Sequence, residues 1–348
     1  MVLSVTELTQ ARAAEWDAYV TAHPDGTFCH RAGWKFAVEA GAGHRSPFLM
    51  AEEDGVLTGV LPLTLRKSAL FGKALVSSMF CVYGGALTTD DAAAAALDDA
   101  AWKLAADNGI GVYEARTRSP AHRDRDGWHS AGVKAATFIR ELPAGDGDEV
   151  LLSIPRKQRA VVRKSLDTGL VCDWTPNIRQ VYELYAASVH GLGTPVFPFA
   201  LFRALTEAFP DNHLCQVIRT GEGKPVASLF SFHDGTTILP YYAGGTREAR
   251  AYGAHDFMYY QLMLRAREMG ITYFDFGRSK LDTGPYSFKK NWGFEPTPLE
   301  YEYRLAPGTT PPDLSPQNAK FALMVKLWKK LPLGVANQLG PLLARHLG

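Results

Sequence analysis

Several features that mark a chain's chemistry are scarce in this sequence. The 348 residues include four cysteines, and none stands in a short Cys-x-x-Cys or Cys/His spacing. Zinc, iron–sulfur and thioredoxin-type sites are therefore unsupported, and we expect no metal. The 37 basic and 36 acidic residues nearly cancel, leaving a formal charge of +1. No overall excess of positive charge favours nucleic acid, and we expect no DNA partner.

Long apolar runs are also missing. No stretch of 18 uncharged apolar residues occurs, so we expect no transmembrane helix. The first residues, MVLSVTELTQARAAEWDAYV, lack the basic head and continuous apolar run of a signal peptide. Isolated cysteines suit a reducing compartment. We therefore predict a cytoplasmic protein, and its 46% hydrophobic and 21% charged residues are typical of a soluble globular one.

An internal repeat is the most informative feature that is present. VYGGAL at 82–87 resembles YAGGTR at 242–247, at an offset of 160 residues (244 − 84 = 160). NGIGVYEAR at 108–116 likewise resembles MGITYFDFG at 269–277, and Glu114 then corresponds to Asp275 at an offset of 161 (275 − 114 = 161). A fixed period shared by separate segments indicates a duplicated unit.

The segments around these motifs repeat in the same order. Residues 48–66 and 215–233 each read as a β-hairpin, because two apolar runs flank a turn that contains glycine. A helical pattern follows at 90–107 and at 254–269, and helix pairs are expected at 11–41 and 178–209. A mostly antiparallel sheet that splits around one crossover helix is the natural packing of this order. We therefore predict an α+β fold of two similar domains.

The expected domains follow from the repeat. The first covers residues 1–150 and the second 151–305, with a basic helix within 151–169 between the halves. The tail, residues 306–348, begins with a Pro-rich linker and continues into amphipathic segments rich in lysine. On its helical face lie Phe321, Leu323, Met324, Leu327 and Trp328. Such a tail can lie at a membrane surface, or dock on its own domain or on a partner; we favour the membrane.

A candidate anion-binding loop follows the strand expected at 238–245. Arg250, Gly253 and His255 approximate the R/Q-x-x-G-x-G/A loop of acyl-CoA N-acyltransferases, with His255 in place of the last Gly or Ala. Free amides and the positive end of a helix dipole bind a diphosphate in such a loop. Arg247 adds positive charge, and Tyr252 and Ala254 complete the expected donor site. The alternative is an ordinary helix start.

A second group of polar residues ends an apolar strand at 273–277. It contains Asp275, Arg278 and Lys280. Polar residues at such a strand end usually face a cleft. Asp275 is a possible base for an amine, and Arg278 and Lys280 can hold an anion or polarise a carbonyl. A salt-bridged loop is the alternative. A short helix at 286–292 and a turn at 293–296 lead to the last strand.

These motifs resemble the FemAB family, in particular its branch associated with the PEP-CTERM/exosortase system. The resemblance rests on FDFGRSK at 274–280, KKNWGFEP at 289–296, LEYEY at 299–303, VYGG at 82–85, RKQRAVVRK at 156–164 and HGLGTPVFP at 190–198. It implies two tandem GNAT-type N-acyltransferase domains with mixed, mostly antiparallel sheets. GNAT enzymes often carry a tyrosine four residues before the Gly-Phe that is Gly293-Phe294 here. Lys289 stands at that position, so we assign protonation of the leaving thiolate to Tyr286.

The remaining candidates complete the predicted site. His190, expected in a loop near the cleft, is an alternative base to Asp275. We expect the first domain to have lost donor binding and to shape the acceptor site. The predicted acceptor contacts are Tyr83, Glu114, Tyr241, Lys280, Lys289 and Trp292. Arg156, Lys157, Arg159, Arg163 and Lys164 could clamp CoA phosphates, contact lipid head groups or tRNA, or form a solvated face.

The resemblance and the tail together predict an N-acyltransferase peripheral to the inner membrane. An acyl-thioester, acyl-CoA by preference, would be a co-substrate, with no permanently bound cofactor. The acceptor would be an amine of a lipid or envelope precursor, with a sphingoid base (ceramide synthesis) as the specific prediction. Transfer of an amino acid to a peptidoglycan or exopolysaccharide precursor is a second hypothesis. The chain lacks the long coiled-coil insertion of tRNA-dependent relatives, which disfavours tRNA. The third hypothesis is a non-catalytic assembly factor at the membrane.

Overall fold

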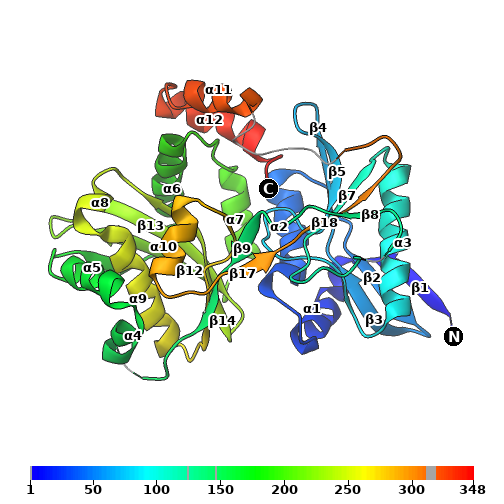
Figure 1. Ribbon diagram of the computed structural model, residues 1–348, viewed down its shortest axis with the longest axis horizontal. Coiled ribbons are helices and arrows are strands. Elements are labelled where there is room, and N and C mark those ends of the chain that lie inside the picture. The colour runs from blue at the N-terminus through cyan, green and yellow to red at the C-terminus, as the bar shows by residue number, and fades with distance from the viewer. Residues whose placement is uncertain (1, 124, 146, 311–318) are drawn as a thin grey trace.

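Two sheet-and-helix halves lie side by side in the computed structural model (Figure 1), which describes residues 2–123, 125–145, 147–310 and 319–348, and only the backbone of 319–322. In the first half, strands pair in the orders β1-β2-β3-β6 and β4-β5-β7-β18-β8. Its strands are β1 (Leu3–Glu7), β2 (Leu49–Glu53), β3 (Val56–Leu61), β4 (Thr64–Ser68), β5 (Gly72–Val76), β6 (Leu87–Thr88), β7 (Val112–Ala115) and β8 (Trp128–Ser130). Its helices are α1 (Ala13–Ala22), α2 (Ala32–Ala42) and α3 (Asp91–Asp107), with 3-10 turns at Gln10–Arg12 and Phe28–His30.

The second half is built on a six-stranded sheet in the order β10-β15-β14-β13-β12-β11. Its strands are β10 (Ile139–Glu141), β11 (Val171–Trp174), β12 (His213–Arg219), β13 (Pro225–His233), β14 (Thr237–Gly245) and β15 (Tyr273–Asp275). Its helices are α4 (Gly147–Ser153), α5 (Arg156–Leu166), α6 (Ile178–Leu192), α7 (Phe199–Ala208), α8 (Ala249–Tyr252), α9 (Ala254–Glu268) and α10 (Gly284–Asn291). Between the halves, β9 (Ala135–Thr137) pairs with β16 (Ser279–Lys280) and β17 (Thr297–Leu299).

The predicted repeat is present in the fold. In the first half β5, α3 and β7 form a parallel strand pair around a crossover helix, with Leu75 opposite Tyr113. In the second half β14, α9 and β15 form the same unit, with Ile238 opposite Phe274. Tyr113 and Phe274 are the two positions that the sequence repeat aligns. The fold is therefore the predicted α+β duplication with mixed, mostly antiparallel sheets.

Each half lends a strand to the other. β10 precedes residue 150 in the chain but pairs antiparallel with β15 in the sheet of the second half. β18 (Glu302–Leu305) follows that half in the chain but pairs with β7 and β8 of the first. The boundary at residue 150 stays a prediction, and the exchanged strands show that neither half completes its sheet from its own segment alone.

A continuous apolar core joins the halves. Helices α2 and α7 pack so closely that a Cβ on Gly41 would lie 2.4 Å from the Cα of Leu201. Phe28 of the first half stacks on Phe232 of the second, with ring centroids 5.0 Å apart. Burial of this much aromatic surface fixes one half against the other.

The tail forms a helical hairpin at the edge of the molecule, seen at the top of Figure 1. α11 (Ala319–Trp328) and α12 (Leu333–Ala344) are joined by a short turn. Most of the predicted Pro-rich linker, and the side chain of Phe321, lie outside what the structure describes. Trp328 is buried against the body, whereas Leu323 and Leu327 are more than half exposed. No helix among the described residues is long and apolar enough to cross a bilayer.

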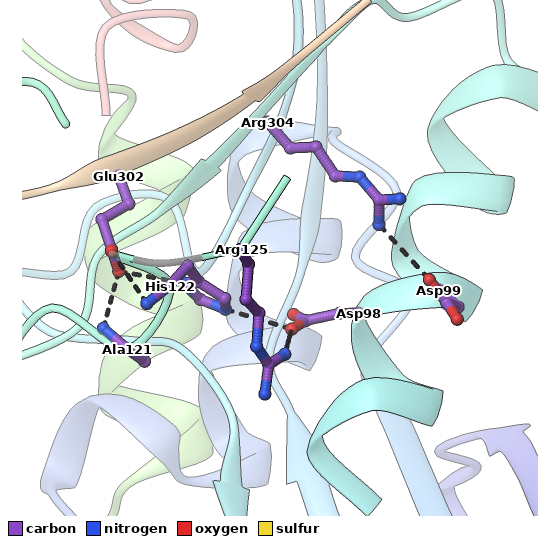
Figure 2. A network of polar contacts seen from close by, with 7 residues as sticks. All are labelled: Asp98, Asp99, Ala121, His122, Arg125, Glu302 and Arg304. Carbon is purple, nitrogen blue, oxygen red and sulfur yellow. Dashed lines mark hydrogen bonds and ion pairs between the residues drawn. The ribbon is translucent and has the colours of Figure 1, made fainter. Parts of the chain in front are cut away.

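A buried ionic network fastens β18 to the first half (Figure 2). Glu302 accepts hydrogen bonds from the amides of Ala121 and His122, and His122 Nδ1 lies 2.9 Å from the Glu302 carboxylate. His122 Nε2 lies 3.1 Å from Asp98 on α3, and Arg125 also pairs with Asp98. Burial opposes charge on the imidazole, but the two carboxylates outweigh it and raise the pKa of His122.

We predict that Glu302→Gln lowers the free energy of unfolding by about 2 kcal/mol, because the protonated His122 ring loses a carboxylate partner. The pKa of His122 is raised in the folded protein, so its contribution is complete below the ordinary histidine pKa of about 6.5. That contribution is lost as the pH rises through the raised value. Urea unfolding between pH 6 and 9 checks this. A difference between variant and parent that does not shrink with rising pH would contradict it.

Candidate functional site

The sheet of the second half opens between β14 and β15. The two strands pair in parallel only at Thr237–Tyr273 and Ile238–Phe274. β14 then runs on from Leu239 to Gly245, bonded to β13 on its other side. In the described part of the chain no strand pairs with the β15-facing side of this segment. Backbone amides and carbonyls along this edge are therefore free to bind an extended ligand.

Asp275 ends β15 at this opening. Its side chain is 4% exposed. Oδ1 accepts hydrogen bonds from the amide of Gly277 (2.7 Å) and the hydroxyl of Tyr83 (3.2 Å). Oδ2 of Asp275 accepts no hydrogen bond within the described chain. This oxygen is not fully buried. Burial raises the pKa of Asp275 to about 6, although both hydrogen bonds and nearby Arg118 and Lys289 favour the ionised form. Asp275 can therefore exchange a proton near neutral pH.

Tyr83 is the residue of the first half that bonds to Asp275. It lies beyond β5, is 1% exposed, and its hydroxyl contacts both Asp275 and Thr137 of β9. Burial and the Asp275 charge raise the pKa of Tyr83 well above its ordinary value, so it remains a neutral donor. The loop that leads to Tyr83 holds Ser78 and Phe80 at a φ of 62° each. Non-glycine residues in this left-handed region are strained and often occur at functional sites.

The structure corrects the prediction that Lys289 and Trp292 contact the acceptor. Lys289 is buried, and its ammonium donates to the carbonyls of Phe276, Gly277 and Arg278 at 2.7–3.1 Å. All three of its donors hold the loop after β15, and burial lowers its pKa to about 7. Trp292 is 0% exposed, and its indole donates to Asp256. Both residues are therefore part of the support for the loop and for α9.

The predicted donor loop begins α9. Gly253 precedes the helix at a φ of +64° and has no side chain to cap the first amides, while the carboxylate of Asp256 in the first turn accepts a hydrogen bond from its own amide. Arg247 and Arg250 are exposed beside it, Tyr252 is partly buried, and Ala254 is fully buried. The ring of His255 turns back to Gly245, where a Cβ would lie 2.5 Å from it. Burial lowers the pKa of His255, so the ring is neutral and adds no positive charge.

The basic helix α5 packs against this helix start. The side chain of Ser165 lies beside Gly253, and Gln158 bonds to Asp256 in the first turn of α9. Val162 between them is fully buried. The exposed cations Arg156, Lys157, Arg163 and Lys164 therefore stand on the remaining surface of α5. Among the described residues none of these four has an ion-pair partner.

Three predicted residues lie differently from expectation. His190 is on helix α6, not in a loop, and its Nε2 bonds to the carbonyl of Leu331 in the tail (3.0 Å). This contact ties the tail to the body and gives no support to a role as base. Glu114 is buried and accepts a hydrogen bond from Arg116 at 2.8 Å. The hydroxyl of Tyr241 donates to the carbonyl of Phe80, so this side chain joins the two halves.

Three other predicted site residues lie at or near the surface. Tyr286, in the first turn of α10, packs edge-on against Phe138 with ring centroids 5.3 Å apart. Its role as acid stays a prediction. Arg278 and Lys280 are exposed after β15. The guanidinium carbon of Arg278 lies 5.3 Å from the ring centroid of Tyr301.

Sequence reasoning missed Thr137 and Arg118. Thr137 lies on a three-residue strand without a motif. Arg118 lies over the ring of Tyr83, 5.2 Å from its centroid. A signal for Arg118 exists, because an arginine follows each copy of the repeated strand, although Arg118 stands one position later than the offset of 161 from Arg278 requires (278 − 161 = 117).

Two cavities in the structure lie away from these groups. One, of about 470 Å³, is lined by Asp98, Arg125, Trp128 and neighbours in the first half. The other, of about 220 Å³, is lined by Trp174, His213, Arg265 and neighbours. The candidate site therefore rests on the opening of the sheet and its polar groups. Among the described residues no cluster of three or more His, Cys, Asp or Glu side chains could hold a metal ion.

The family model described as "Acetyltransferase (GNAT) domain" matches residues 156–290. This range contains α5, the opening between β14 and β15, the start of α9 and Asp275. No curated protein matches the chain in sequence. The prediction of an acyltransferase enzyme is confirmed by this domain.

Solved structures share the fold over most of the chain. FemX is 16% identical with a TM-score of 0.66, and the match covers 87% of this chain and 97% of FemX. A tandem GNAT protein from the clavulanic acid biosynthesis pathway is 13% identical with a TM-score of 0.56, covering 89% and 100%. The C-terminal domain of a putative lysylphosphatidylglycerol synthetase from Agrobacterium fabrum is 15% identical with a TM-score of 0.57, covering 84% and 93%. The second half of the chain thus contains a GNAT acetyltransferase domain, within a fold shared with tandem GNAT proteins.

Proposed function

We propose that the protein transfers an acyl group from acyl-CoA to an amine carried by a lipid or envelope precursor. The observation that carries the proposal is Asp275. It is a buried carboxylate whose pKa is raised to about 6, placed where β15 ends beside the open edge of β14. An amine must lose a proton to attack a thioester, and a carboxylate with this pKa is ionised at pH 7 yet basic enough to assist.

The steps follow from the groups at the opening. The acceptor amine approaches Oδ2 of Asp275, while Oδ1 is held by Tyr83 and Gly277. The nitrogen attacks the thioester carbonyl, its proton passes to Asp275, and the carbon–sulfur bond breaks to release CoA. Backbone amides on the open edge of β14 are the proposed donors to the oxyanion. A proton returns to the leaving sulfur, and Tyr286 is the proposed acid.

The donor is proposed to bind at the start of α9. The amides before Asp256 and the helix dipole attract a diphosphate, and Arg247 and Arg250 are exposed beside them without an ion-pair partner in the described chain. The exposed cations of α5 extend this positive surface. The same cations favour a second candidate, in which an aminoacyl-tRNA is the donor and its phosphates follow α5.

The acceptor class is proposed from the tail. Apolar side chains more than a third exposed occur on both tail helices: Leu323, Met324, Leu327, Leu333, Val335, Leu339 and Leu342. Lys326, Lys329 and Lys330 are exposed next to them. Apolar side chains flanked by lysines suit the interface of an anionic membrane. A sphingoid base as the particular acceptor stays a prediction that only this tail supports.

For catalysis, we predict that Asp275→Asn lowers kcat/KM for the amine by about 10² to 10⁴-fold, because the general base is lost. In the parent, kcat/KM should rise as the pH increases through about 6 and Asp275 ionises. The pH profile of the variant should lack this rise. Thiol release from acyl-CoA with a panel of long-chain amines measures both. Asp282→Asn, an exposed residue nearby, is the matched control. Equal activity of Asp275→Asn and parent would show that the base is misplaced.

For the donor, Arg250→Ala should raise the KM for acyl-CoA about tenfold with little change in kcat, since it removes a phosphate contact that is made before and during reaction. Arg265→Ala, at the far end of α9 and paired with Glu268, should leave KM unchanged. The measurement is initial rate against acyl-CoA concentration. Transfer from aminoacyl-tRNA with none from acyl-CoA would contradict the proposal and favour the second candidate.

For the tail, Leu323→Glu should weaken binding to vesicles that contain phosphatidylglycerol by about tenfold, because a charge replaces an apolar contact at the lipid surface. Leu70→Glu, in the turn between β4 and β5 where Leu70 is 54% exposed, is the control. Vesicle flotation measures both variants and the parent. Equal flotation of the two variants would count against membrane docking by this surface.

A further inference from the structure

Each half contributes one exposed arginine near the candidate site. Arg118 lies three residues beyond the end of β7, and Arg278 lies three residues beyond the end of β15. At the offset of 161 that relates these strands, the two arginines are one position out of register. Both side chains are exposed. Neither guanidinium has a carboxylate within ion-pair distance in the described part of the chain. Two unpaired cations are not needed for the deprotonation of an amine.

Both arginines lie over aromatic rings that belong to or contact the dipeptide Val82–Tyr83. Arg118 lies over the ring of Tyr83. Arg278 lies over the ring of Tyr301, whose hydroxyl donates to the carbonyl of Val82 at 2.7 Å. A Cβ on Gly277, the residue before Arg278, would lie 3.5 Å from the side chain of Val82. The aromatic faces hold the two arginines beside one short segment of backbone.

The residues next to these arginines carry unsatisfied hydroxyls. Thr117 is 8% exposed and Ser279 is 6% exposed. Thr117 Oγ1 and Ser279 Oγ are both buried without a hydrogen-bond partner among the described residues. Buried hydroxyls normally find a hydrogen-bond partner, so the hydroxyls of Thr117 and Ser279 are available to acceptor atoms of a ligand that enters beside the arginines.

We propose that Arg118 and Arg278 bind a phosphate group on the acceptor, so that the substrate is an amine that also bears a phosphate ester. The inference rests on the proposed function, because it places this phosphate next to the amine at Asp275. Guanidinium groups bind phosphate oxygens in pairs of hydrogen bonds, and two of them offset the single negative charge of Asp275. The phosphate can belong to a soluble molecule or to a lipid head group.

Calorimetric titration of the full chain without acyl donor tests the proposal. O-phosphoethanolamine is compared with ethanolamine, and vesicles of phosphatidylethanolamine in phosphatidylcholine provide the lipid arm. We expect O-phosphoethanolamine or the vesicles to bind at least tenfold more tightly than ethanolamine. Arg118→Met and Arg278→Met should each weaken that binding about tenfold. Arg123→Met, which removes an exposed arginine paired with Glu300, should leave it unchanged.

The outcomes separate this inference from the proposed function. Arginine-dependent binding of O-phosphoethanolamine identifies a soluble phosphate ester, and such binding only to vesicles identifies a lipid head group; both support the inference. Binding that is absent, or equal in Arg118→Met, Arg278→Met and Arg123→Met, overturns it. Acyl transfer to amines with an unchanged KM in the double arginine variant would overturn the inference and leave the proposed function standing.

Discussion

The hydrogen bond between Tyr83 and Asp275 is the contact on which the candidate site depends. It joins the first half of the chain to the last residue of a strand in the second. Burial makes the carboxylate a stronger base, and the tyrosine and the Gly277 amide keep it ionisable near neutral pH. The two halves are thus required together, because the second half supplies the carboxylate and the first sets its environment.

The exchanged strands give this contact its rigidity. β10 completes the sheet beside β15, and β18 returns to pair with β7. Lys289 holds the loop after Asp275 through three carbonyls, and Gln158 and Trp292 hold Asp256 at the start of α9. The proposed acceptor and donor groups are therefore both supported by buried polar contacts, which is what a precisely aligned reaction requires.

The local elements and their order could be predicted from sequence, whereas their long-range partners could not. The crossover helix at 254–268 and the hairpin within 213–233 follow from apolar spacing and turn residues, which are local signals. The pairing of β18 with β7 is not local, and four residues carry too little pattern to specify it. Asp275 was identifiable because it ends an apolar strand. Lys289 and Trp292 were misassigned because burial by α9 and the loop of 276–278 is a tertiary property.

The two copies of the repeat differ in the chemistry of one aligned position. Glu114 corresponds to Asp275 in sequence, yet Arg116 occupies its carboxylate, so the two positions have diverged in chemistry. Arg118 and Arg278 are one position out of register at this offset, yet both are exposed and neither has an ion-pair partner in the described chain.

The most direct test of the central claim is the titration of Asp275 itself, followed by carboxyl ¹³C chemical shifts in protein labelled at aspartate, with Asp275→Asn to assign the signal. The account predicts a midpoint near pH 6, and a higher one in Tyr83→Phe, where a hydrogen bond that favours the ionised form is lost. A midpoint near the ordinary aspartate value of about 3.9, unchanged in Tyr83→Phe, would contradict it.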